Sequence, residues 1–156
     1  MKLSNTTVKI LSNFAAINPG MIFNPGNIQY TISPLNTIVC KTTLAEDFPQ
    51  TFAIYDLEMM LKLYKTIDDA DLEFGEDHLL IKNDREQIKF YFADANVIVA
   101  PKRLPYNHDN VVLSFPVDND IIQKIKSLSN SATFFKHLKI YTKKTDICLA
   151  LTNKES

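Results

Sequence analysis

The chain has 156 residues, 46% of them hydrophobic and 22% charged, with a formal net charge of −1. This composition is typical of a globular protein with a buried core, and it excludes a protein that is basic all over. Any affinity for a polyanion must therefore come from where the charges lie. The longest apolar run, from Ile147 to Leu151, is far shorter than the roughly 20 residues of a membrane helix. Because there is also no signal peptide, we expect a soluble, cytoplasmic protein with no membrane contact.

The first predicted element is a helix over Asn5–Ile17, in which Val8, Leu11 and Ala15 recur at helical spacing. The sequence Asn18-Pro19-Gly20 ends it. Strands are predicted next at 21–23, 28–32 and 37–43, separated by turn signals rich in proline, glycine and asparagine. Cys40 and Cys148 lie in strand patterns and form no CxxC pair, which favours reduced, buried thiols.

The same order of elements then recurs. A short strand at 52–55 leads to Asp56, which caps a helix that runs to about residue 67, and strands follow at 71–74, 79–82 and 87–93. Glu58 and Lys62 of this helix are in the favourable i,i+4 order. A third copy begins with the apolar segment 111–117, continues with a helix capped by Asp118, and adds strands at about 135–142 and 147–152. Three such repeats predict an α+β protein built from duplicated units.

Residues 94–110 differ in character, with two prolines among several polar residues. This composition is typical of a connector between domains. We therefore predict a complete domain of two repeats over 1–93, a connector over 94–110, and a partial second domain over 111–156.

Lysine gathers on the later turns of the three helices, whereas the four helical acids all lie in a first turn. The lysines are Lys9, Lys62, Lys65, Lys124 and Lys126, and the acids are Asp56, Glu58, Asp118 and Asp120. The helix macrodipole alone would explain this pattern in each helix separately. If the helices lie side by side on one sheet face, however, their lysines form a shared surface that holds phosphates without reading sequence.

Other residues offer weaker chemistry. Asp56 and Asp118 are conceivable as a catalytic pair, but each stands where an N-cap belongs. The histidines 78, 108 and 137 are isolated, which favours solvated turn or strand residues, and the acidic tract 68–73 lacks the glycine and glutamate of a calcium loop. We expect no metal, no cofactor and no enzyme, because nucleophile and glycine-rich phosphate motifs are missing from the sequence. The run Phe90-Tyr91-Phe92 fits a base-stacking platform or, more commonly, core packing with Tyr91 on the opposite face.

Several short stretches resemble the sliding clamps, or DNA polymerase processivity factors, of T-even-type tailed phages. They are Met1-Lys2-Leu3-Ser4, Asn13-Phe14-Ala15 with Ile17-Asn18 and Gly20, Ala53-Ile54-Tyr55-Asp56-Leu57, and Val99-Ala100-Pro101. They occur in the family's order and spacing, and the similarity is strongest over residues 1–101.

The resemblance implies a DNA-clamp fold of βαβββ units, with antiparallel sheets outside and helices on the inner face. It also implies a non-catalytic homotrimeric ring that encircles double-stranded DNA without sequence preference, is loaded by a clamp loader and tethers the replicative DNA polymerase, in the host cytoplasm if phage-encoded. By position, the five helix lysines named above become DNA-facing candidates. A partner-peptide groove near the connector would involve Val97, Val99, Pro101, Leu104 and Tyr106.

The chain departs from the family at its second domain, which family members complete. In related clamps, a sheet edge that corresponds to residues 87–93 pairs with a strand of the neighbouring subunit. The counterpart of that strand would follow residue 153 here, so a closed trimer of this 156-residue form is in question. The alternative is a truncated, clamp-like protein-interaction module that forms no closed ring. A small-molecule enzyme on an unrelated α+β fold is a third hypothesis, and the sequence offers no polar constellation for it.

Overall fold

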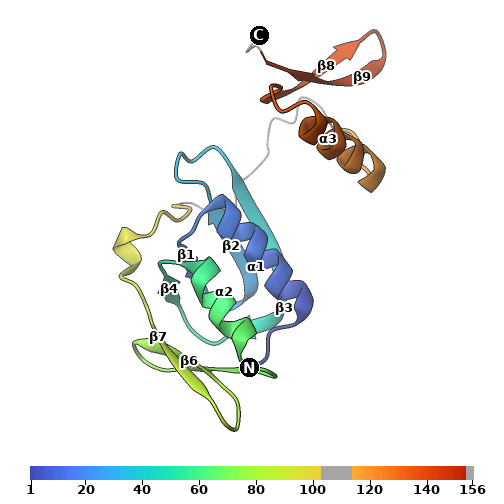
Figure 1. Cartoon of the computed structure of the whole chain (residues 1–156). Helices are drawn as coiled ribbons and strands as arrows, with labels where there is room; N and C mark the ends of the chain where they lie inside the picture. The colour runs from blue at the N-terminus through green and yellow to red at the C-terminus, as the bar shows by residue number, and fades with distance from the viewer. Residues whose placement is uncertain (103–113, 154–156) are drawn as a thin grey trace. The chain divides into compact units, whose positions relative to one another are not determined.

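The computed structural model of the chain describes residues 1–102 and 114–153. The chain divides into two compact units, Met1–Tyr106 and Asn107–Ser156 (Figure 1). The domain limits expected at residues 93 and 111 remain predictions. No helix in the described ranges is long and apolar enough to span a membrane.

The described part of unit 1 contains two α-helices and seven strands in the predicted order, which confirms the α+β class. The elements are α1 (Asn5–Ile17), β1 (Met21–Phe23), β2 (Gly26–Ile32), β3 (Val39–Phe48), β4 (Phe52–Ile54), α2 (Leu57–Thr66), β5 (Asp71–Phe74), β6 (His78–Lys82) and β7 (Gln87–Tyr91), followed by the 3₁₀ turn η1 (Ala95–Val97). All strand pairs are antiparallel: β1 with β4, β2 with β3, and β5 with β6 and β7.

Strand β3 is the largest boundary error of the sequence analysis, because it continues to Phe48 instead of ending at Thr43. Leu44 and Phe48 point into the core, and Glu46 lies between them. The Glu46 carboxylate accepts hydrogen bonds from the Ser4 N–H, at 2.5 Å, and from the Thr7 hydroxyl. These hydrogen bonds connect β3 to the first turn of α1, and they satisfy the Glu46 carboxylate at its half-buried position in the strand.

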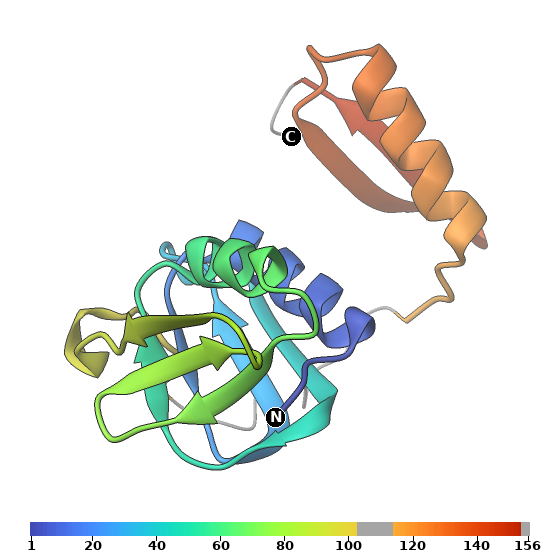
Figure 2. The ribbon, with the colours of Figure 1, turned by 60° about the horizontal axis from the view of Figure 1, so that its bottom comes forward.

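The two helices lie side by side on one side of unit 1, and the strands lie on the other (Figures 1 and 2). They run in opposite directions: Asn5 and Val8 of α1 share a hollow with Tyr64 and Lys65 at the end of α2. One hydrophobic core joins both helices to the strands, and its largest fully buried side chains include Leu11, Phe23, Leu57, Met60, Leu61 and Leu79. The rings of Phe23 and Phe52 stack within it, with centroids 4.5 Å apart.

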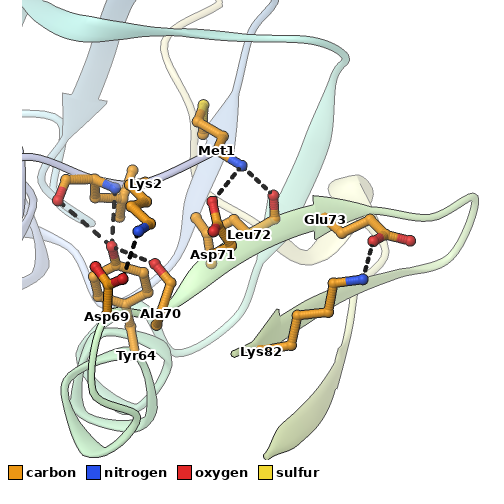
Figure 3. A network of polar contacts seen from close by, with 10 residues as sticks. Met1, Lys2, Tyr64, Asp69, Ala70, Asp71, Leu72, Glu73 and Lys82 are labelled. Carbon is orange, nitrogen blue, oxygen red and sulfur yellow. Dashed lines mark hydrogen bonds and ion pairs between the residues drawn. The ribbon is translucent and has the colours of Figure 1, made fainter. Parts of the chain in front are cut away.

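The two repeats of unit 1 exchange their leading segments. β4, which precedes α2, pairs with β1, the first strand after α1, and places Ile54 opposite Met21. Reciprocally, Met1, which precedes α1, bonds to Leu72 in β5, the first strand after α2 (Figure 3). The hydroxyl of Tyr64 fixes the same segment, because it accepts from the Leu3 N–H at 2.9 Å and donates to the Ala70 carbonyl at 3.1 Å. The segment before each helix thus bonds to the first strand of the other repeat, and both repeats share one core.

Residues 114–153, the described part of unit 2, form one repeat: α3 (Asn119–Ser131) and the antiparallel pair β8 (His137–Lys143) and β9 (Asp146–Thr152). Residues 114–117 of the apolar segment before α3 form no strand, unlike β4 before α2, and residues 111–113 lie outside the described ranges. Pro116, which lacks an N–H, disfavours a strand there.

No described residue of unit 2 is buried, and Leu128, Phe134 and Ile140 are 51%, 62% and 48% exposed. In unit 1, side chains of this kind are covered because two repeats share a core. The described part of unit 2 holds a single repeat, so its apolar side chains have no such cover.

Candidate nucleic-acid interface

The three helices start where a side chain caps the backbone. Ser4, Asp56 and Asp118 accept hydrogen bonds from the N–H groups of Thr7, Met59 and Ile121, at 3.2, 2.8 and 2.8 Å. Such a cap satisfies an N–H that the helix leaves without a partner. Asp56 and Asp118 are therefore capping residues, as we expected, and their repeated position follows from the repeated helix start.

The five candidate lysines are all exposed. The structure brings Lys9 of α1 together with Lys62 and Lys65 of α2 on the two neighbouring helices of unit 1. Lys124 and Lys126 lie on α3 and belong to unit 2.

A hollow of about 290 Å³ lies between α1 and α2. Its α1 wall is made of small side chains, Ser12, Ala15 and Ala16, while Lys62 and Lys65 line it from α2. We call the line of contact between α1 and α2 the seam. Small residues on its α1 side leave this space open, and the Ser12 hydroxyl donates a 2.8 Å hydrogen bond to the Val8 carbonyl oxygen. Lys9 precedes Ser12 by three residues and so lies on the same side of α1. Among the described residues, the ammonium groups that line the hollow are those of Lys62 and Lys65, and Lys9 lies on α1 outside the lining.

One acid shares this seam. Glu58, in the first turn of α2, lines the same hollow, and its Oε1 lies 2.7 Å from the Lys62 Nζ. This is the i,i+4 pair that the sequence predicted. The hydrogen bond and charge of Glu58 raise the pKa of Lys62 above its ordinary value. Within the described residues, neither Lys9 nor Lys65 has a carboxylate within 4 Å.

The residues expected at a partner-peptide groove follow η1. Ile98 is 9% exposed and packs on Gly20, whereas Val97 and Val99 are 61% and 42% exposed. Pro101 is half-buried, and Leu104 and Tyr106 lie outside the described residues. The structure therefore places Val97 and Val99 at the surface on either side of a buried anchor.

Asn18 holds this segment, a role that sequence reasoning missed. Its amide nitrogen donates to the carbonyl oxygens of Ile32 and Val99, both at 2.9 Å, and its Oδ1 accepts from the Gly20 N–H at 3.0 Å. Asn18 is 5% exposed. Its position after a helix suggested only a helix terminator, and a buried amide with three partners is not evident from the sequence.

The aromatic run at residues 90–92 and His78, also considered as functional candidates, are explained by packing and local contacts. Tyr91 is 61% exposed, while Phe90 and Phe92 pack against the core, as expected for a strand with two different faces. His78 is less solvated than we predicted, because its ring lies over Gly75 and its Nδ1 is 2.6 Å from the Asp77 carboxylate. Across residues 1–102 and 114–153, no three histidine, cysteine or acidic side chains could together hold a metal ion.

The expectation of buried thiols is wrong. Cys40 on β3 and Cys148 on β9 are both free and half-buried. Cys40 only packs against the edge of the core, and the repeat that contains Cys148 has no buried residue among those described.

Comparison with known sequences defines the class of protein. The profile of the DNA polymerase processivity factor family matches residues 2–100, and the chain belongs to this family. Membership agrees with the expected DNA-clamp version of the α+β fold and with the expectation of a non-catalytic protein.

Individual relatives are sliding clamps of phages. The chain is 30% identical over 132 residues to the sliding clamp of Vibrio phage KVP40. The matched region covers 83% of this chain and 60% of the relative. Identity to the sliding clamps of Escherichia phage RB69 and Enterobacteria phage T4 is 29% and 30%, over 99% of this chain and 63% of each relative. The chain thus spans about three-fifths of the length of these relatives.

Proposed function

We propose that the chain acts as a sliding-clamp processivity factor, which surrounds duplex DNA as part of a ring and tethers a DNA polymerase without catalysis of its own. Family membership carries this proposal. The lysine-bearing seam between α1 and α2 supports it, because a clamp needs a positive surface that does not read sequence. The phage origin of the relatives supports action in the cytoplasm of an infected host cell.

The DNA-facing residues of this proposal are Lys9, Lys62 and Lys65 of unit 1 and Lys124 and Lys126 of α3. Surface lysines hold a DNA backbone through charge, and each neutralised phosphate adds about 0.9 to the slope of log affinity against log salt. Retention on DNA would then depend on encirclement, while direct affinity stays low. Low affinity is what allows a ring to move along the duplex.

The proposed partners are a DNA polymerase and an ATP-driven clamp loader. A hydrophobic tail peptide of such a partner would bind at Val97, Val99, Pro101, Leu104 and Tyr106. The exposure of Val97 and Val99, next to a backbone fixed by Asn18, supports this site. Residues 1–93 would form the complete domain, 94–110 the connector and 111–156 part of the second domain.

The proposed ring is a homotrimer, and β7 is the candidate edge for a neighbouring subunit. In the described part of unit 1, β7 pairs with β6 on one side only. An open strand edge is a natural site for pairing with another chain.

The test is retention on circular DNA in the presence of the clamp loader and ATP. The proposal expects the protein to stay on a nicked circle and to be released when the circle is cut once. Equal retention before and after the cut would contradict encirclement. A monomer that binds polymerase tail peptides but is never retained on a circle would instead support the protein-interaction module.

A further inference from the structure

Glu58 is placed where a DNA clamp would be expected to avoid an acid. It lines the hollow between α1 and α2 together with Lys62 and Lys65, and among the residues that the structure describes it is the only acid that does so. Its side chain is 67% exposed and that of Lys62 is 69% exposed, so solvent reaches both. A phosphate that approached the hollow would meet the Glu58 charge as well as the two ammonium groups.

Helix stability explains Glu58 only in part. An acid in a first turn and an i,i+4 pair both stabilise a helix. The start of α2, however, is already capped by Asp56, which supplies a negative charge there. Exposed ion pairs contribute little to stability, so the pair can open without loss of the fold. Lys62 therefore has two possible partners, the Glu58 carboxylate and an incoming phosphate.

We propose that Glu58 is an internal competitor for phosphate, which limits how tightly the hollow holds the DNA backbone. The hollow is a phosphate subsite served by Lys62 and Lys65, and Lys62 exchanges between Glu58 and a phosphate oxygen. Because the Lys62–Glu58 pair replaces the Lys62–phosphate pair, the phosphate contact breaks at a small net cost in free energy, and the DNA backbone can move along the hollow. This inference rests on the proposed function.

The chain offers a matched control for the key variant. Glu73 on β5 forms an ion pair with Lys82 on β6, on the strand side of unit 1 (Figure 3). Glu58→Gln and Glu73→Gln therefore make the same change in net charge and each frees one lysine. Only Glu58→Gln frees a lysine at the seam.

The experiment measures binding of the full chain to a short linear duplex by fluorescence anisotropy, over a range of salt concentrations. We expect Glu58→Gln to bind about three- to tenfold more tightly at low salt, with a slope of log affinity against log salt steeper by about 1. Glu73→Gln should change affinity less than about twofold, since its freed lysine lies away from the seam. In the Lys62→Gln background the gain from Glu58→Gln should disappear, which a double-mutant cycle measures.

The outcomes separate this inference from the proposed function. If Lys65→Gln weakens binding but Glu58→Gln and Glu73→Gln behave alike, the competitor role is overturned and DNA binding at the seam stands. A gain from Glu58→Gln that persists in the Lys62→Gln background also overturns it. If neither the wild type nor Glu58→Gln shows salt-dependent binding, both the inference and DNA contact at the seam fail. Unchanged circular dichroism and urea midpoints of each variant show that it folds.

Discussion

The α-amino group of Met1 donates a 2.8 Å hydrogen bond to the carbonyl oxygen of Leu72, and it lies 3.2 Å from the Asp71 carboxylate. The Leu72 N–H in turn donates to the Met1 carbonyl oxygen, also at 2.8 Å. Met1 thus makes two reciprocal backbone hydrogen bonds with Leu72 of β5, although it belongs to no strand itself. This contact spans 71 positions of sequence and holds the two repeats together.

Blocking this amino group should therefore destabilise unit 1. Adding Gly-Ser before Met1 moves the charge away from Asp71 and replaces the ammonium donor to Leu72 with a neutral amide N–H, and we expect a loss of about 1 kcal/mol. Urea unfolding of the extended and unextended chains, followed by circular dichroism, measures this loss. Lys2→Ala is the control, because it removes only the exposed pair between Lys2 and Asp69 and should leave the urea midpoint nearly unchanged. Equal midpoints for the extended and unextended chains would show that the Met1 contact contributes nothing.

Glu46 should make the stability of unit 1 depend on pH in the acid range. Partial burial acts to raise the pKa of Glu46, but the hydrogen bonds from Thr7 and Ser4 together outweigh it, so the pKa lies below its ordinary value. A carboxyl whose pKa is lowered by folding stabilises the fold above its unfolded pKa of about 4.3. That stabilisation is lost as the pH falls through the lower, folded pKa.

Glu46→Gln therefore should cost about 1 kcal/mol at pH 7 and much less near pH 3. Urea midpoints of wild type and variant across pH 3–7 are the measurement, and the two curves should converge at low pH. Glu76→Gln, an exposed acid in the β5–β6 turn, should run parallel to the wild type. A constant difference between wild type and Glu46→Gln at all pH values would contradict the assigned pKa direction.

Asn18 links the end of α1 to the segment that follows η1. Asn18→Ala leaves the carbonyl groups of Ile32 and Val99 and the N–H of Gly20 without their partner, and we expect it to cost about 2–3 kcal/mol. It should also free the backbone around Val99, so amide hydrogen exchange in residues 95–100 should accelerate more than in β1 or β4.

The control for Asn18 lies in the same segment. Asn96 is exposed, and its amide nitrogen donates to the neighbouring Asp94 carboxylate, so Asn96→Ala should leave both stability and exchange near the wild-type values. Protection of residues 95–100 that survives Asn18→Ala would mean that Ile98 alone anchors the segment.

Periodicity and capping residues in the sequence predicted the helices and most strands of unit 1, but they did not predict its long-range contacts. The helical period and the capping residues located α1 and α2 to within one residue, and the order of Glu58 and Lys62 predicted their ion pair. β3 ran past its predicted end, because Glu46 looks like a loop residue until Ser4 and Thr7 are seen to bind it.

No sequence pattern near Met1 or β4 indicated that the segment before each helix bonds to a strand of the other repeat. Met1 meets β5 through Asp71, and Tyr64 bonds to Leu3 of the same segment, and both partners lie far along the chain. For the candidate site, sequence located the lysines, but the depression between Ser12, Ala16 and Lys65 depends on how two helices pack. The relation between the lysines of α3 and those of unit 1 depends on the arrangement of two units, which no local pattern encodes.

Gly20 offers a test of how tightly the segment after η1 packs on the end of α1. A Cβ at Gly20 would lie 3.0 Å from Cδ1 of Ile98 and 3.3 Å from its Cγ2. Gly20→Ala therefore should force Ile98 outward and cost about 1–2 kcal/mol, as overpacking does in a closed interior. Ile98→Val removes the nearer methyl group, so it should recover part of this loss in the double variant, even though alone it costs about 1 kcal/mol. A double-mutant cycle on urea unfolding measures the coupling, and strictly additive losses would show that Gly20 and Ile98 do not compete for the same space.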